Sequence, residues 1–194
     1  MNDFVEDYLG LTKASDIVLS LKQSPIKKIV RAYFDRDLKE ERESRIPNHE
    51  LFNNLFGTIL LYLENGDVIG FDIMDIKDSI VCWYEVLHGI LYEKDPYMRE
   101  LHRYMDHDDP IYSTKDNWAH MIGEKITSIK VLVYDKGKIQ RYFDDSFQNA
   151  IIFETAKGDM VLSNCLLGFG SPFPLTRKSE IPQEIWDKAT VIEL

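Results

Sequence analysis

The densest group of residues able to do chemistry lies between positions 102 and 109. Its members are His102, Asp106, His107, Asp108 and Asp109. Imidazoles and carboxylates act as metal ligands and as general acids or bases. His102 and Asp106 are four residues apart, so on a helix both would project from one face, as metal ligation requires. A catalytic zinc site needs three protein ligands, however, and the run is equally well explained as a solvated helix end before Pro110.

Other catalytic patterns are missing from the sequence. There is no Gly-x-Ser-x-Gly motif, and neither Cys82 nor Cys165 has a neighbouring charged group that would lower its pKa. The glycines of 168–171 are followed by Pro172, which leaves no helix N-terminus to hold a phosphate. We therefore expect no catalytic residue, no metal and no cofactor.

The net charge is concentrated in the middle of the chain. The 194 residues carry 23 Lys and Arg against 33 Asp and Glu, a net charge of −10. Residues 57–109 hold twelve acids and four bases, which accounts for −8 of that total. A nucleic-acid-binding domain would show a basic stripe instead, so we expect no nucleic acid partner. An acidic face could attract a basic protein, or the acids could simply keep the chain soluble.

Tyrosines accompany these acids, and tyrosine carries much of the binding energy at protein interfaces. The alternative is that the rings are ordinary core residues. The residues that we predict to contact a partner are Glu93, Asp95, Glu100, Asp106, Asp108, Asp109, Tyr97 and Tyr104.

The length and pattern predict one α+β domain over 1–194, with two hairpin-containing β units that form antiparallel sheet. The expected parts are a first β unit (26–75), a helical insertion (78–122), a second β unit (126–167) and a C-terminal cover (168–194). The segment 26–36 resembles 126–136, and 59–69 resembles 151–161. A duplication would explain this, and so would chance, because strand–turn–strand patterns look alike.

Turn and helix signals support this division. Asn65-Gly66 and, more weakly, Lys157-Gly158 predict hairpin turns. Residues 1–24 are expected to form one amphipathic helix with frayed ends. Apolar spacing predicts inserted helices over 80–91 and 96–105, although 81–84 would also suit a strand. Residues 116–123 and 180–188 suit short helices.

No apolar run approaches the roughly 18 residues that a membrane span needs, and the acidic start does not resemble a secretory signal. Two cysteines beside apolar residues suggest reduced, buried thiols. We therefore expect a cytoplasmic protein with no membrane partner.

The opening of the second unit, Gly123-Glu124-Lys125-Ile126, with residues 147–152 and 158–163, resembles the immunity proteins of bacterial polymorphic-toxin and contact-dependent growth-inhibition systems. The resemblance covers about a quarter of the chain. It implies a cytoplasmic protein that binds one cognate toxin domain, often a nuclease, without catalysis or cofactor.

The first hypothesis is accordingly a non-enzymatic binding protein that neutralises a basic partner. A metal-assisted hydrolase that uses His102, Asp106 and His107 is the second. A self-associating structural or regulatory protein is the third, and the sequence does not fix the oligomeric state.

Overall fold

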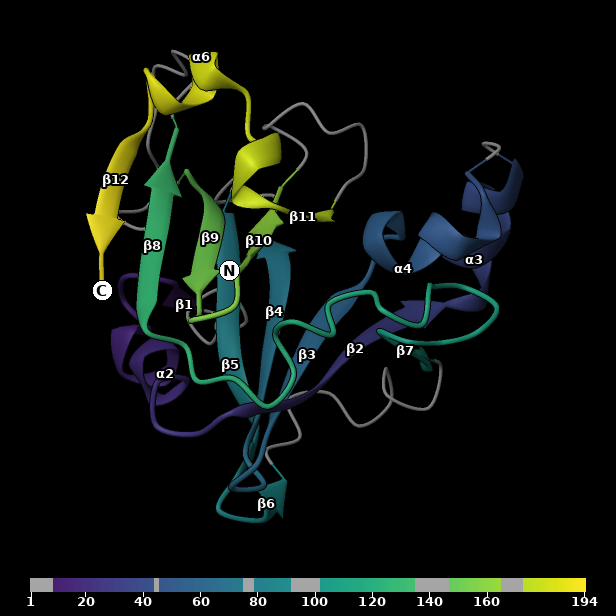
Figure 1. Cartoon of the computed structure of the whole chain (residues 1–194), viewed down its shortest axis with the longest axis horizontal. Helices are drawn as coiled ribbons and strands as arrows, with labels where there is room; N and C mark the ends of the chain where they lie inside the picture. Colours follow the sequence, from purple (N-terminus) through teal and green to yellow (C-terminus); the bar gives the residue numbers. More distant parts are fainter. Residues whose placement is uncertain (1–8, 44–45, 75–78, 92–101, 135–146, 165–172) are drawn as a thin grey trace, which may run out of the picture.

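The computed structural model describes residues 9–43, 46–74, 79–91, 102–134, 147–164 and 173–194. These residues form two antiparallel sheets that pack face to face, with few helices (Figure 1). The α+β class and the antiparallel pairing predicted from the sequence are confirmed.

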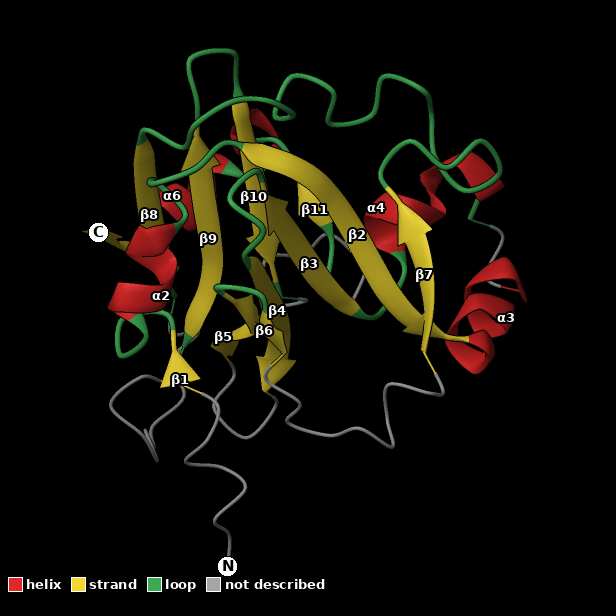
Figure 2. Ribbon diagram, turned by 90° about the horizontal axis from the view of Figure 1, so that it is seen from below, coloured by secondary structure: helices red, strands yellow, loops and turns green. Residues whose placement is uncertain are grey.

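The first sheet, sheet A, has the strand order β1-β5-β4-β3-β2-β7, and β6 pairs with β5. Its strands are β1 (Leu9–Gly10), β2 (Ile26–Phe34), β3 (Thr58–Leu63), β4 (Val68–Met74), β5 (Ser79–Leu87), β6 (Ile90–Leu91) and β7 (His102–Asp106). Figure 2 shows β7 beside β2 at the margin of this sheet.

The second sheet, sheet B, has the order β11-β10-β9-β8-β12. Its strands are β8 (Ser128–Val133), β9 (Gln148–Glu154), β10 (Asp159–Ser163), β11 (Leu175–Thr176) and β12 (Thr190–Glu193). The meander β8-β9-β10 repeats the order of β2-β3-β4, as the two-unit division predicts. The same order arises in any three-stranded meander, so the duplication itself stays a prediction.

The main core lies between the sheets. Ile59, Leu61 and Phe71 of sheet A face Ile151 and Phe153 of sheet B, and the rings of Phe71 and Phe153 meet edge to face at 5.7 Å between centroids. Alternate residues of each strand point into this layer because the side-chain period of a strand is two. The buried Cys82 lies in this core.

The helices of the described residues are short. They are α2 (Ser15–Ser20), α3 (Asp35–Glu43), α4 (Leu51–Asn54) and α6 (Gln183–Trp186). Val18 and Leu21 pack into the core beside α2, which confirms the apolar face predicted there. The predicted helix over 1–24 is wrong in extent, because Leu9–Gly10 form β1 and α2 has only six residues. Within the described residues, no helix has the length and apolar character needed to cross a membrane.

Both predicted hairpin turns are present, each with a four-residue loop. In the first, Gly66 adopts a φ of +92°, and the side chain of Asn65 accepts a hydrogen bond from the Asp67 amide at 3.1 Å. In the second, Thr155 N donates to Gly158 O at 2.8 Å. The turn residues therefore predicted the two hairpins correctly.

The predicted helical insertion over 78–122 is wrong wherever the structure describes it. Residues 79–87 form the strand β5, and 102–106 form the strand β7. Residues 116–123 form successive turns rather than a helix. In β5 the first five residues are all buried, so the strand lacks the alternation that would distinguish it from a buried helix.

Outside the main core, each sheet has apolar residues on its outer face. On sheet B, Leu132, Ile152 and Val161 are covered by Ile185 and Trp186 of α6, which confirms the inward orientation predicted for these two residues. On sheet A, Val30, Leu60 and Val68 form a smaller cluster.

Candidate protein-binding surface

The predicted partner contacts divide into two sets of four. Glu93, Asp95, Tyr97 and Glu100 lie outside the described residues. Tyr104, Asp106, Asp108 and Asp109 lie on β7 and in the turn that follows it. The structure thus places the second set together, at the edge of sheet A.

Two of these carboxylates already have partners within the chain. Asp106 Oδ1 lies 2.9 Å from Lys28 Nζ, and both side chains are about two-fifths exposed. Asp109 Oδ1 accepts hydrogen bonds from the amides of Ile111 at 2.8 Å and Tyr112 at 3.1 Å. Asp109 therefore shapes the turn, whereas Asp106 holds a surface ion pair that a partner could replace.

Asp108 and Tyr104 are the members of this set that face solvent. Asp108 is exposed and forms no ion pair with any described residue. Tyr104 is 49% exposed and projects from the outer face of sheet A, opposite Ala32 of β2. An exposed carboxylate and an exposed tyrosine at one sheet edge offer charge and contact area to a basic protein surface.

The predicted metal-binding pair, His102 and Asp106, required a helix, but these residues lie on the strand β7. His102 and Asp106 lie on the same outer face of β7, but four residues of strand separate their Cα atoms by about 13 Å. His107 follows with alternate orientation, and its Nδ1 is buried. Among the described residues, no three His, Cys, Asp or Glu side chains are grouped so that they could hold a metal ion.

Other acids of the 57–109 segment serve the fold. Asp67 accepts hydrogen bonds from the Asn65 side chain and the His88 amide, each at 2.8 Å. Asp72 accepts from the Thr58 hydroxyl at 2.7 Å, and Glu85 accepts from the indole of Trp83 at 3.0 Å. The charge excess of this segment therefore overstates the acidic surface that its described residues offer.

A row of side chains crosses the outer face of sheet A at one level. Successive cross-strand pairs place Leu91 of β6, Val86 of β5, Val68 of β4, Tyr62 of β3 and Lys28 of β2 side by side. We call these five residues the outer row. Val68 is buried, Val86 and Tyr62 are half-buried, and Leu91 is 43% exposed. Because Lys28 binds Asp106, the outer row ends at the acidic turn after β7.

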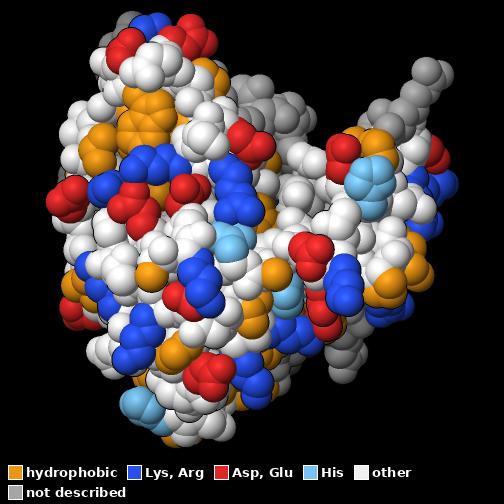
Figure 3. All heavy atoms as spheres, viewed as in Figure 1, with side chains coloured by type: hydrophobic (Ala, Val, Ile, Leu, Met, Phe, Trp, Pro, Cys, Tyr) orange, Lys and Arg blue, Asp and Glu red, His pale blue; other side chains and the backbone are white. Residues whose placement is uncertain are grey.

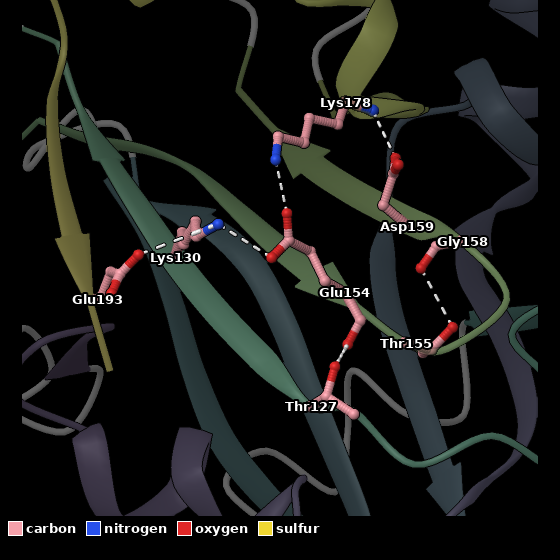
Figure 4. Close-up of polar contacts among 8 residues, drawn as sticks. All are labelled: Thr127, Lys130, Glu154, Thr155, Gly158, Asp159, Lys178 and Glu193. Atoms are coloured by element: carbon pink, nitrogen blue, oxygen red, sulfur yellow. Dashed lines mark hydrogen bonds and ion pairs between the residues drawn. The ribbon is translucent and has the colours of Figure 1, made fainter.

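The outer face of sheet B carries charges that neutralise each other. Figure 4 shows Glu154 between Lys130 and Lys178, with nitrogen–oxygen distances of 2.9 Å and 2.6 Å. Hydrogen bonds from these two lysines lower the pKa of Glu154 to about 2, and the bond to Glu154 raises the pKa of Lys130. Figure 3 shows acidic and basic side chains interleaved over the face seen there, without a large patch of one sign.

A second polar group joins the loop before β8 to the segment after β11. Arg177 stacks over the ring of Trp118 at 4.9 Å and binds His120. The Trp118 indole donates to Asn53 Oδ1 at 2.8 Å. Since these contacts link segments 57 to 65 residues apart, the group holds the fold together, and no pattern in the sequence predicted it.

A buried arginine makes the strongest link of this kind. Arg31 of β2 is fully buried and donates to the carbonyls of Phe52 at 2.7 Å and Phe173 at 3.0 Å, and also to that of Leu55. Burial lowers the pKa of Arg31 to about 9, against the opposing effect of Asp72. Arg31 thus joins β2, α4 and the segment that leads into β11.

Comparisons with known protein families, with curated proteins and with solved structures found no match to this chain.

Proposed function

We propose that this chain is a non-enzymatic cytoplasmic protein that binds and neutralises a basic protein partner, such as the nuclease domain of a toxin. The observation that carries the proposal is the exposed Asp108, without an ion pair to a described residue, in the turn that follows β7, the strand that carries the half-exposed Tyr104. Nuclease domains bind phosphate with basic grooves, and carboxylates can occupy such grooves.

The test needs the partner, which affinity capture from the native host supplies as a basic protein recovered in equal amount. Its association rate with the purified chain is then measured at several salt concentrations. Charges at the rim of an interface act mainly on this rate, and salt screens them.

The informative variant is Asp108→Lys. Reversing Asp106 or Asp109 would also break the ion pair with Lys28 or the turn at Ile111, so their effects on binding would be mixed with effects on the fold. We expect Asp108→Lys to slow association several-fold at low salt and to flatten its salt dependence. Glu184→Lys, an equal charge change at an exposed position of α6, is the matched control.

Equal rates for the wild type and Asp108→Lys at low salt would contradict the proposal for this surface. A similar effect of Glu184→Lys would show that total charge matters and that the position of the carboxylate does not.

A further inference from the structure

The last strand of sheet B has a free edge. Among the described strands β12 pairs with β8 alone, and Figure 1 shows it at the left margin of the molecule. The amide of Leu194 donates to the Ile129 carbonyl at 3.0 Å. Bonded and non-bonded pairs alternate in an antiparallel ladder, so Ile192 also bonds to β8, whereas the N–H and C=O groups of Val191 and Glu193 point away from β8. These outward groups can pair with another strand.

The strand β12 lacks the features that keep a sheet edge from pairing with another chain. Natural edges are protected by lysine, proline, bulges or very short strands. The sequence of β12, Thr-Val-Ile-Glu, holds neither lysine nor proline, and its register with β8 has no bulge. The strands β1, β6 and β11 have two residues each, and β7 carries Arg103 and Asp106. Among the described edges, β12 is therefore the one best suited to strand pairing.

A second β12 fits this edge in an antiparallel arrangement about a two-fold axis at Ile192. Val191 of each copy would lie opposite Glu193 of the other, and the two residues of each such pair would exchange both backbone hydrogen bonds. Ile192 would face Ile192 of the second copy in the non-bonded type of pair, where side chains are closest. Because Ile192 packs against the main core, the apolar layer would continue from one copy into the other.

Charges of both signs lie close to β12. Glu193 Oε1 lies 4.0 Å from Lys130 Nζ of β8. Asp187 and Lys188, both exposed, precede the strand, and Lys22 Nζ binds the carbonyl of the residue that follows it at 2.6 Å. Although the whole chain has a net charge of −10, this edge is close to neutral. It therefore does not repel a second copy, and it offers no acidic patch to a basic protein.

We propose that two copies of this chain pair through β12, so that their B sheets join into one continuous sheet across a two-fold axis. This inference is independent of the proposed function. The strands β12 and β7 lie on opposite sides of the molecule in Figure 1. Each copy would therefore keep the acidic turn after β7 exposed.

The experiment measures the mass of the chain by light scattering over a concentration series, and the wild type should reach twice the mass of one chain. Val191→Pro removes an outward N–H but no bond to β8, whereas Val191→Thr keeps this N–H and is the matched control. We expect Val191→Pro to raise the dissociation constant of the dimer about tenfold or more, and Val191→Thr to keep it within about twofold of the wild type.

Two charge variants test the register, and they replace the proline variant should it fail to fold. Val191 is 42% exposed, so this position can take a charged side chain. Val191→Glu would place a like charge opposite Glu193 of the second copy, whereas Val191→Lys would place an opposite charge there. We expect the dimer of Val191→Glu to dissociate about tenfold more readily than that of Val191→Lys.

Three results would overturn the inference. The first is a wild type that stays monomeric up to about 1 mM. The second is a dimer that Val191→Pro leaves unchanged, which would place the contact elsewhere. The third is an equal dissociation constant for Val191→Glu and Val191→Lys, which would exclude this register. None of these results concerns capture of a basic protein, which tests the proposed function alone.

Discussion

The outer faces of the two sheets use charge and apolar area in different ways. On sheet B, Glu154 is held between two lysines and the apolar side chains lie under α6. On sheet A, the outer row ends in the exposed Leu91 at one side and in Lys28, bound to Asp106, at the other, and Asp108 is exposed in the turn that follows β7. The first face satisfies its groups within the chain, whereas the second leaves some of them exposed to solvent.

A count of charges therefore does not locate a binding surface. Glu154 and Asp108 are both carboxylates in a chain of net charge −10, yet only Asp108 is free to meet a cation from outside. The partners of each carboxylate decide whether its charge stabilises the fold or remains available for binding.

The largest expected effect comes from breaking the link between the sheets. Arg31→Met leaves the carbonyls of Phe52, Leu55 and Phe173 without this donor in the interior. We expect the free energy of unfolding to fall by about 3 kcal/mol or more, measured by urea denaturation. Arg31→Lys keeps the charge but reaches fewer carbonyls, so it should lose less. A change below about 0.5 kcal/mol for Arg31→Met would show that Arg31 does not join the sheets.

The second prediction breaks the packing on the outer face of sheet A. A Cβ atom at Gly70 would lie 2.6 Å from ring atoms of Trp83, so Gly70→Val must displace this indole. We expect a loss of about 1–3 kcal/mol in the free energy of unfolding and a changed tryptophan fluorescence, because the indole would lose its bond to Glu85. Gly70→Ala should have a smaller effect of the same kind. Unchanged stability and fluorescence in Gly70→Val would mean that Trp83 does not cover Gly70.

Much of this two-sheet architecture could be predicted from local chemistry. Asn65-Gly66 and Lys157-Gly158 indicated hairpins because their backbone preferences act within a few residues. The helices predicted over 80–91 and 96–105 are wrong where the structure describes them. In the first, apolar residues at positions 80, 83, 84 and 87 satisfy the helical spacing as well as a strand buried on both faces, so a strand over 81–84 also suited the sequence. The pairing with β4, β6 and β1 settles β5 as a strand, and the pairing with β1 joins Leu9 to Cys82, far along the chain.

The candidate surface was predicted less well than the fold. The sequence indicated Tyr104, Asp106 and Asp108, but it could not show that Asp106 binds Lys28, a residue 78 positions away. It also missed the His88-Gly89 turn, because histidine is not among the residues that usually mark a tight hairpin turn. Ile90 and Leu91 therefore looked like part of a helix rather than the exposed strand β6.

The third prediction concerns the neutralised face of sheet B. Glu154→Gln removes the charge that binds Lys130 and Lys178, and we expect a loss of about 1–2 kcal/mol in the free energy of unfolding at pH 7. The carboxyl has a pKa of about 2 in the folded chain against 4.5 unfolded, so its contribution is complete above about pH 4.5. It is lost as the pH falls towards 2. Wild type and variant should thus differ in stability at pH 7 and converge near pH 2, and a constant difference would contradict the assignment.

The smallest expected effect is that of Asp108→Asn, which removes the same charge on the other face. Asp108 is exposed and pairs with no described cation, so the free energy of unfolding at pH 7 should change by less than about 0.5 kcal/mol. Urea denaturation of Asp108→Asn and Glu154→Gln under the same conditions compares the loss in free energy of unfolding when one negative charge is removed from each sheet. Equal losses would mean that Asp108 stabilises the fold as Glu154 does. If Asp108→Asn is as stable as the wild type but associates more slowly with the basic partner, this carboxylate contributes to binding and not to the stability of the fold.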